Sequence, residues 1–100
     1  MKKLFISQPM NGKPEEEILK ERETAKRIAE EIVGEELELI DSYFKENVPE
    51  DAGCLWYLGD SIKLLDKADY VYFCDGWYKA KGCKIEMQCC DFYKKEVLVP

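Results

Sequence analysis

The sequence contains no histidine, and this absence excludes a large part of enzyme chemistry. Ser–His and Cys–His mechanisms need an imidazole as general base, so neither is available to this chain. A zinc ion would have to be held without imidazole, and no Cys-x-x-Cys pair is present, so we expect no metal. Acid–base or nucleophilic chemistry therefore falls to carboxylates, thiols, lysines or tyrosines.

Long apolar runs and glycine-rich nucleotide motifs are also missing. No run approaches the roughly 18 apolar residues of a membrane span, and Met1-Lys2-Lys3 precedes too short an apolar segment for a secretion signal. We therefore expect a cytoplasmic protein without a membrane partner. Neither a Walker A motif nor Gly-x-Gly-x-x-Gly occurs, which disfavours ATP hydrolysis and tight dinucleotide binding, and we expect no cofactor.

The composition fits a single small folded domain over residues 1–100, with 46% apolar and 36% charged residues. The net charge of −6 argues against a nucleic-acid polymer as partner, although a helix N-terminus and a few lysines suffice for one nucleotide. A core this small favours a homodimer or higher homo-oligomer. The five cysteines are an odd number, which disfavours disulfides; we expect them to pack, with a reactive Cys83 near a helix start as the alternative.

Apolar spacing predicts strands and helices in strict alternation. Strands are expected at residues 3–7, 37–40, 70–74 and 96–99, and helices from Pro14 to a stop at Gly34, across residues 55–65, and from Gly82 onward. In the last helix, Ile85, Cys89 and Phe92 share one face. This order predicts an α/β flavodoxin-like three-layer sandwich with a four-stranded parallel sheet in the order 2-1-3-4 and three helices.

In such a sheet, the segments that follow the first three strands meet at one edge, where this class of fold binds ligands. The candidate residues placed there are Ser7, Gln8, Pro9, Met10, Asn11, Gly12, Asp41, Asp75, Trp77, Gly82 and Glu86. We expect a small-molecule site at this edge.

Glu86 is the main candidate for chemistry, because it falls in about the first turn of a helix, where the dipole favours the ionised carboxylate. Beside a second acid, such as Asp41 or Asp75, it would suit displacement at a sugar anomeric carbon, and Trp77 would stack on a base. The structural alternatives are a helix-end role for Glu86, turn capping for the aspartates and simple partial burial for Trp77.

Two signatures carry a family resemblance. The first is Phe5-Ile6-Ser7-Gln8-Pro9-Met10-Asn11-Gly12-Lys13, and the second combines Ala68-Asp69-Tyr70-Val71-Tyr72-Phe73, Gly76-Trp77 and Ala80-Lys81-Gly82-Cys83-Lys84-Ile85-Glu86. Together they resemble a small bacterial and phage domain family of unknown function, related to the nucleoside 2-deoxyribosyltransferases. The resemblance implies that Glu86 is a nucleophile, that residues 7–12 bind sugar or phosphate, and that Asp60 contributes to the site.

Three functional hypotheses follow. The first is an enzyme that cleaves or transfers the N-glycosidic bond of a nucleoside or nucleotide through Glu86. The second is a non-catalytic module that binds or senses a nucleotide in the same cleft. The third is a small interaction protein that uses its acidic surface, with Glu86 tied to a lysine on that surface.

Overall fold

The computed structural model describes all residues 1–100, and its elements alternate as the apolar spacing predicts. They are, in chain order, β1 (Lys3–Ser7), α1 (Glu15–Val33), β2 (Glu38–Leu39), α2 (Cys54–Asp66), β3 (Tyr70–Phe73), the short 3₁₀ helix η1 (Trp77–Lys79), α3 (Lys81–Tyr93) and β4 (Glu96–Leu98).

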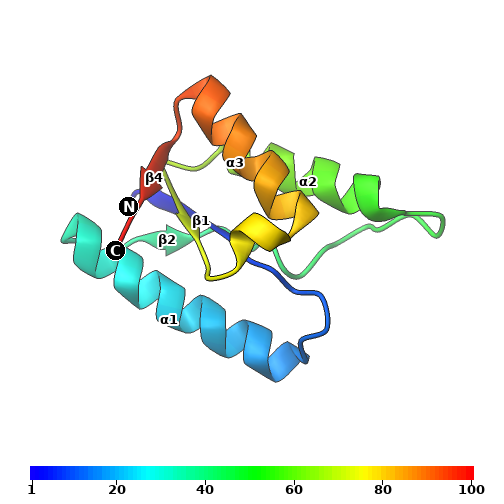
Figure 1. Ribbon diagram of the computed structural model, residues 1–100, viewed down its shortest axis with the longest axis horizontal. Helices are drawn as coiled ribbons and strands as arrows, with labels where there is room; N and C mark the ends of the chain where they lie inside the picture. Colours follow the sequence, from blue (N-terminus) through cyan, green and yellow to red (C-terminus); the bar gives the residue numbers. More distant parts are fainter.

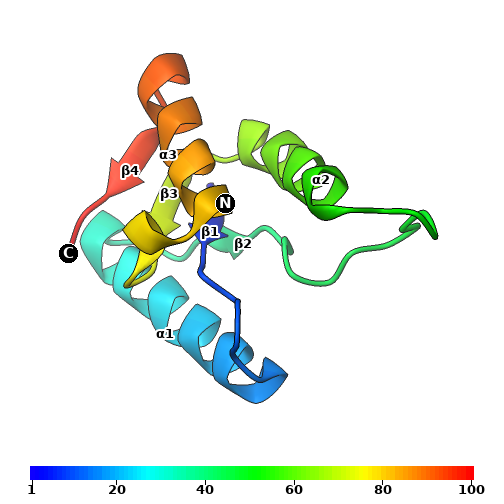
Figure 2. The ribbon, with the colours of Figure 1, turned by 45° about the vertical axis from the view of Figure 1, so that its right-hand side comes forward.

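The four strands form one parallel sheet in the order β2-β1-β3-β4, which confirms the predicted topology. Helix α1 covers one face, and α2 and α3 cover the other (Figures 1 and 2). The alternation of side chains along β1 explains the two layers: Leu4 and Ile6 pack with the α1 side, whereas Phe5 packs with residues of α2 and α3. The fold is therefore an α/β three-layer sandwich.

Helix α1 buries a stripe in which one residue is charged. Ile18, Arg22, Ala25 and Ala29 are spaced four, three and four apart and all are buried. Gly34 ends the helix in the left-handed conformation, at φ 85°, as its place after the apolar pattern predicts. A buried arginine among apolar side chains calls for a polar environment at that point of the sheet edge.

The last helix differs from the prediction in two ways. It begins at Lys81, one residue before the predicted Gly82, so Glu86 lies in its second turn. Its buried residues are Cys83, Glu86 and Cys90, whereas Ile85 and Phe92 are exposed. The face of α3 that covers the sheet is therefore not the face that carries Ile85 and Phe92.

Helix α2 is apolar in composition but poorly buried. Leu65 is its one buried residue, and Leu55, at its start, is 80% exposed. The segment before it, residues 40–53, crosses the sheet edge without helix or strand, as predicted for residues 45–53. No helix is both long and apolar enough to cross a membrane.

Candidate functional site

The central feature of the site is a buried hydrogen bond between the ends of two elements. Ser7 closes β1, and its Oγ donates to Oε1 of Glu86 on α3 at 2.6 Å. Ser7 is 1% exposed and Glu86 is 7% exposed. Because Ser7 follows Phe5 and Ile6 in a strand, the pleat turns it to the same face as Phe5, under α3. The fold therefore joins two of the predicted site residues that are 79 positions apart.

The surroundings of Glu86 make its carboxylate costly to ionise. Burial raises its pKa, while the hydrogen bond from Ser7 and the charge of Lys45 act in the opposite direction. This corrects the expectation that the helix dipole would hold Glu86 ionised, because the dipole acts mainly within the first turn and Glu86 lies in the second. The ionised form is thus stabilised by a hydroxyl and an ammonium group.

Lys45 brings a cation to the site from the segment between β2 and α2. Its Nζ lies 3.1 Å from Oδ2 of Asp60 and 3.1 Å from Oγ of Ser61, both on α2. Only 10% of its side chain is exposed, and its charge lowers the pKa of Glu86. Asp60 therefore contributes through Lys45, as an anchor for the cation.

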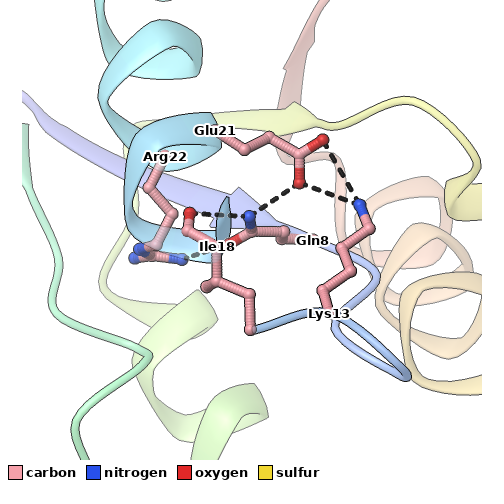
Figure 3. Close-up of polar contacts among 5 residues, drawn as sticks. All are labelled: Gln8, Lys13, Ile18, Glu21 and Arg22. Carbon is pink, nitrogen blue, oxygen red and sulfur yellow. Dashed lines mark hydrogen bonds and ion pairs between the residues drawn. The ribbon is translucent and has the colours of Figure 1, made fainter. Parts of the chain in front are cut away.

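Gln8 belongs to a polar cluster that attaches the β1 end to α1 (Figure 3). Its Nε2 donates to the carbonyl of Ile18 at 3.0 Å and to Oε1 of Glu21 at 2.7 Å. Lys13 pairs with the same Glu21 at 3.2 Å, and Arg22 reaches Oε1 of Gln8 at 3.5 Å. Gln8 is buried, so it positions the loop and does not lie open to a ligand.

The rest of that loop lies beside the segment after β3. Pro9 is close to Gly76, because a Cβ on Gly76 would lie 4.0 Å from the Pro9 ring. Pro9 and Met10 are half-buried, whereas Asn11 and Gly12 are exposed in a turn in which Gly12 has φ 78°. The loops after β1 and β3 therefore converge, as predicted.

The two predicted partner acids do not join Glu86. Asp41 is exposed, and its Oδ1 accepts from the backbone N–H groups of Tyr43 and Phe44, which is a turn-capping role. Asp75 is also exposed. Burial raises the pKa of Tyr72, whose side chain packs on the α1 side of the sheet, and the charges of Cys74 and Asp75 add to this shift. Both acids are at the expected edge, but the structure places no second carboxylate against Glu86 at these positions.

Trp77 and Gly82 flank the start of α3. Trp77 is half-buried in η1 and packs on Phe73 with ring centroids 5.4 Å apart. A Cβ on Gly82 would meet Leu58 at 3.9 Å, an ordinary contact, so protein packing does not require glycine there. The partial burial of Trp77 agrees with the structural alternative, in which this side chain only packs against its neighbours.

The cysteines are free thiols, and the buried ones are poor nucleophiles. Burial raises the pKa of Cys83, which corrects the alternative that its place near the helix start makes it reactive. Burial likewise raises the pKa of Cys74 to about 12 and that of Cys90 to about 11. These thiols pack in the core or beside Ser7.

Arg22 and Lys45, two cations of this edge, were not among the sequence-predicted site residues, and neither was Lys13. Arg22 could have been recognised from the sequence, because it occupies a position in the apolar stripe of α1. Lys45 had no such signal, since it lies in an irregular segment and is brought to Glu86 by its bonds to α2.

Two hollows on the surface lie away from this site. One, of about 500 Å³, is lined by Met1, Lys2, Glu35 and Glu36, and the other is lined by polar side chains of α1. Neither is lined by a predicted site residue.

Comparison with protein families gives one result. A family model described as "Domain of unknown function (DUF4406)" matches residues 2–99. Neither the curated proteins nor the solved structures give a match.

Proposed function

The chain belongs to the DUF4406 family of domains of unknown function, and from its site we propose that it cleaves or transfers the N-glycosidic bond of a nucleoside or nucleotide, with Glu86 as nucleophile. The observation that carries the proposal is the buried Ser7–Glu86 hydrogen bond at the carboxyl edge of the two central strands. A carboxylate kept out of water without an ion pair within 4.0 Å reduces stability, so a functional role explains its presence. The resemblance to the nucleoside 2-deoxyribosyltransferases supports the same residue.

The chemistry would proceed by two displacements at the sugar C1′. The free oxygen of Glu86, Oε2, forms a bond to C1′ while the C1′–N bond breaks, and the electron pair passes to the departing base, which takes a proton from water. In hydrolysis, a water oxygen then attacks C1′, the ester bond to Glu86 breaks, and the proton passes to solvent. In transfer, the nitrogen of a second base replaces that water.

The neighbours of Glu86 have defined roles in this scheme. Ser7 donates to Oε1, which orients the carboxylate and stabilises its charge. Lys45, held by Asp60, favours the ionised form that the first displacement needs. Activity is therefore expected to fall as the pH drops through the raised pKa of Glu86.

A second candidate function is a non-catalytic module that binds or senses a nucleotide. It is favoured by the exposed positions of Asp41 and Asp75, which leave Glu86 without a neighbouring acid to protonate the leaving base. In that case nucleotides would raise the melting temperature without any release of base. The third hypothesis, an interaction protein, expects Glu86 on the surface beside a lysine, and the carboxylate is instead buried.

The test is a panel of nucleosides and nucleotides with release of free base as the readout. Glu86→Ala and Glu86→Gln are expected to reduce base release by at least about 10³-fold while the far-UV circular dichroism spectrum is kept. Glu31→Gln, an exposed glutamate on α1, is the matched control and is expected to keep full activity. Wild-type turnover in both Glu86 variants would refute the role of Glu86. Thermal stabilisation by a nucleotide with no base release from any compound would favour the binding module.

We also propose that the chain forms a homodimer or higher homo-oligomer. The apolar side chains of α2 and the outer face of α3 are left exposed, including Leu55, Tyr57, Phe92 and Tyr93. By contrast, the outer face of α1 is mostly charged, and its exposed apolar residues, Leu19 and Ile32, are 38% and 40% exposed, whereas Leu55, Phe92 and Tyr93 are 77% exposed or more. Exposed apolar surface concentrated on one side of a small domain supports an interface there.

A further inference from the structure

The guanidinium of Arg22 is a buried cation of the sheet edge that lacks a carboxylate partner. Lys13 pairs with Glu21 and Lys45 pairs with Asp60, in both cases within 3.2 Å. Arg22 is more deeply buried than either, at 4% exposure, and it makes no ion pair within 4.0 Å.

The contacts of Arg22 are long and their acceptors are neutral. Its Nη1 lies 3.5 Å from Oε1 of Gln8, and its Nη2 lies 3.4 Å from the carbonyl of Ile40 and 3.2 Å from Oγ of Ser42. Charge-assisted hydrogen bonds from arginine to an anion are about 2.7–2.9 Å long, so these contacts satisfy the group only weakly. A buried charge without a counter-charge is destabilising unless another group compensates it.

Asp41 acts on Arg22 without pairing with it. Burial lowers the pKa of the guanidinium and the charge of Asp41 raises it, but no ion pair joins the two within 4.0 Å, and Oδ1 of Asp41 accepts from two backbone N–H groups of its own turn. Gln8 cannot improve its contact either, because its Nε2 is fixed by Ile18 and Glu21, which leaves only its amide oxygen toward Arg22 (Figure 3).

The position also provides a route for a ligand. Arg22 lies at the carboxyl edge of a parallel sheet, between the loop after β1 and the segment after β2. Residues 41–48 make no backbone–backbone hydrogen bond, so Ser42 is held there by side-chain contacts alone. A small movement of that segment would expose the guanidinium fork without breaking the sheet.

We propose that Arg22, with Ser42 beside it, forms a binding site for a tetrahedral oxyanion of the phosphate class at this edge of the sheet. Two oxygens of the anion would accept from the guanidinium nitrogens in place of the Gln8 and Ile40 oxygens, and the Ser42 hydroxyl would donate to it. The site lies on the α1 side of the sheet, whereas Glu86 lies on the other side, and it does not depend on catalysis by Glu86.

The first experiment uses inorganic phosphate and the intact chain. Isothermal titration calorimetry and thermal unfolding are measured in phosphate and in chloride of equal ionic strength. Phosphate is expected to raise the melting temperature of the wild type and of Arg27→Met, a control that removes an exposed arginine from the same helix. Arg22→Met is expected to bind phosphate at least tenfold more weakly. No specific phosphate effect in the wild type, or an unchanged effect in Arg22→Met, would overturn the site.

If Arg22→Met does not fold, Arg22→Lys and Ser42→Ala replace it. The lysine keeps the charge but loses the two-pronged geometry, and the alanine keeps Arg22 but loses the hydroxyl, so each is expected to weaken phosphate binding severalfold. Phosphate affinity equal to that of the wild type in both variants would overturn the site.

A second arm separates a free anion from the phosphate group of a nucleotide. A nucleoside and its 5′-monophosphate are titrated into Glu86→Gln, in which the proposed turnover cannot proceed. A monophosphate that binds at least tenfold more tightly than its nucleoside, only when Arg22 is present, assigns the site to a nucleotide phosphate. Equal binding of both, with inorganic phosphate still bound, assigns it to a free anion. Because the readout is binding, failure of the glycosidic chemistry leaves this result intact.

Discussion

The hydrogen bond between Ser7 and Glu86 gives the sharpest quantitative prediction. Ser7→Ala removes the donor and leaves the carboxylate buried. The change in volume is small, because serine and alanine differ by one oxygen atom. The effect on the free energy of unfolding should depend on whether Glu86 is charged. The prediction therefore concerns two variants, Ser7→Ala and Glu86→Gln, and their combination.

The magnitude follows from the geometry of the bond. A 2.6 Å hydrogen bond to a buried carboxylate is charge-assisted, so Ser7→Ala should reduce the free energy of unfolding at neutral pH by about 1.5–3 kcal/mol. In the Glu86→Gln background the bond is between neutral groups, and its loss should cost about 0.5–1.5 kcal/mol. The coupling energy of the pair is then about 1–2 kcal/mol, measurable in a domain whose total stability is about 5–15 kcal/mol.

The pH dependence has a defined sign. Burial raises the pKa of Glu86 above its unfolded value, so the native state holds the proton more tightly. Stability is therefore lost as the pH rises from the unfolded pKa through the folded pKa, and Glu86→Gln, which cannot ionise, should escape this loss. The Ser7 bond favours the ionised form, so its extra contribution should be present above the folded pKa of Glu86 and should disappear below it.

The assay is urea unfolding followed by circular dichroism for the wild type, both single variants and the double variant, at neutral and at acidic pH. Ser42→Ala is the matched control, because it removes another buried serine hydroxyl, which contacts Arg22. Its effect should add to that of Glu86→Gln without coupling. Additive effects of Ser7→Ala and Glu86→Gln within about 0.5 kcal/mol would refute the conclusion that this bond stabilises the ionised carboxylate.

Three further predictions use other parts of the structure. Lys45→Met removes a charge that lowers the pKa of Glu86, so the acid limb of the pH–activity profile should move to higher pH; an unmoved limb would contradict this role. Gly34→Ala should cost about 1 kcal/mol in urea unfolding because Gly34 has φ 85°, whereas Gly59→Ala, inside α2 with free space around it, should be neutral or stabilising. Leu55→Glu should shift the oligomer toward monomer in sedimentation velocity, and an unchanged sedimentation coefficient would exclude this end of α2 from the interface.

The order of the elements could be predicted closely from the sequence, because it depends on local and periodic signals. The strand at residues 3–7 is correct in both bounds, and Pro14 lies immediately before the first helical residue, Glu15. The alternation of strands with helices then restricts the sheet to parallel pairing, and right-handed crossovers restrict the strand order. The second strand is shorter than predicted, because only Glu38 and Leu39 pair with β1.

The composition of the site was less accessible to sequence reasoning. Ser7 and Glu86 were both expected at one edge, but nothing local indicates that they bond to each other across the sheet. Asp41 and Asp75 lie at the predicted edge of the sheet. Their side chains are exposed, however, and that of Asp41 caps its own turn. An aspartate in a turn can cap its own backbone or face the cleft, and the local sequence is the same in both cases.

The amino-acid sequence alone indicates the class of fold, the sheet edge at which we expect a ligand to bind, and the lack of imidazole chemistry. These properties depend on residue type and on spacing over a few residues. Packing between distant segments decided the rest. It set which face of α3 covers the sheet, how deeply Glu86 is buried, and which cations approach the edge. Burial and electrostatic environment are properties of all the atoms that surround a group, so the pKa of Glu86 and the isolation of Arg22 could be recognised only once the chain was folded.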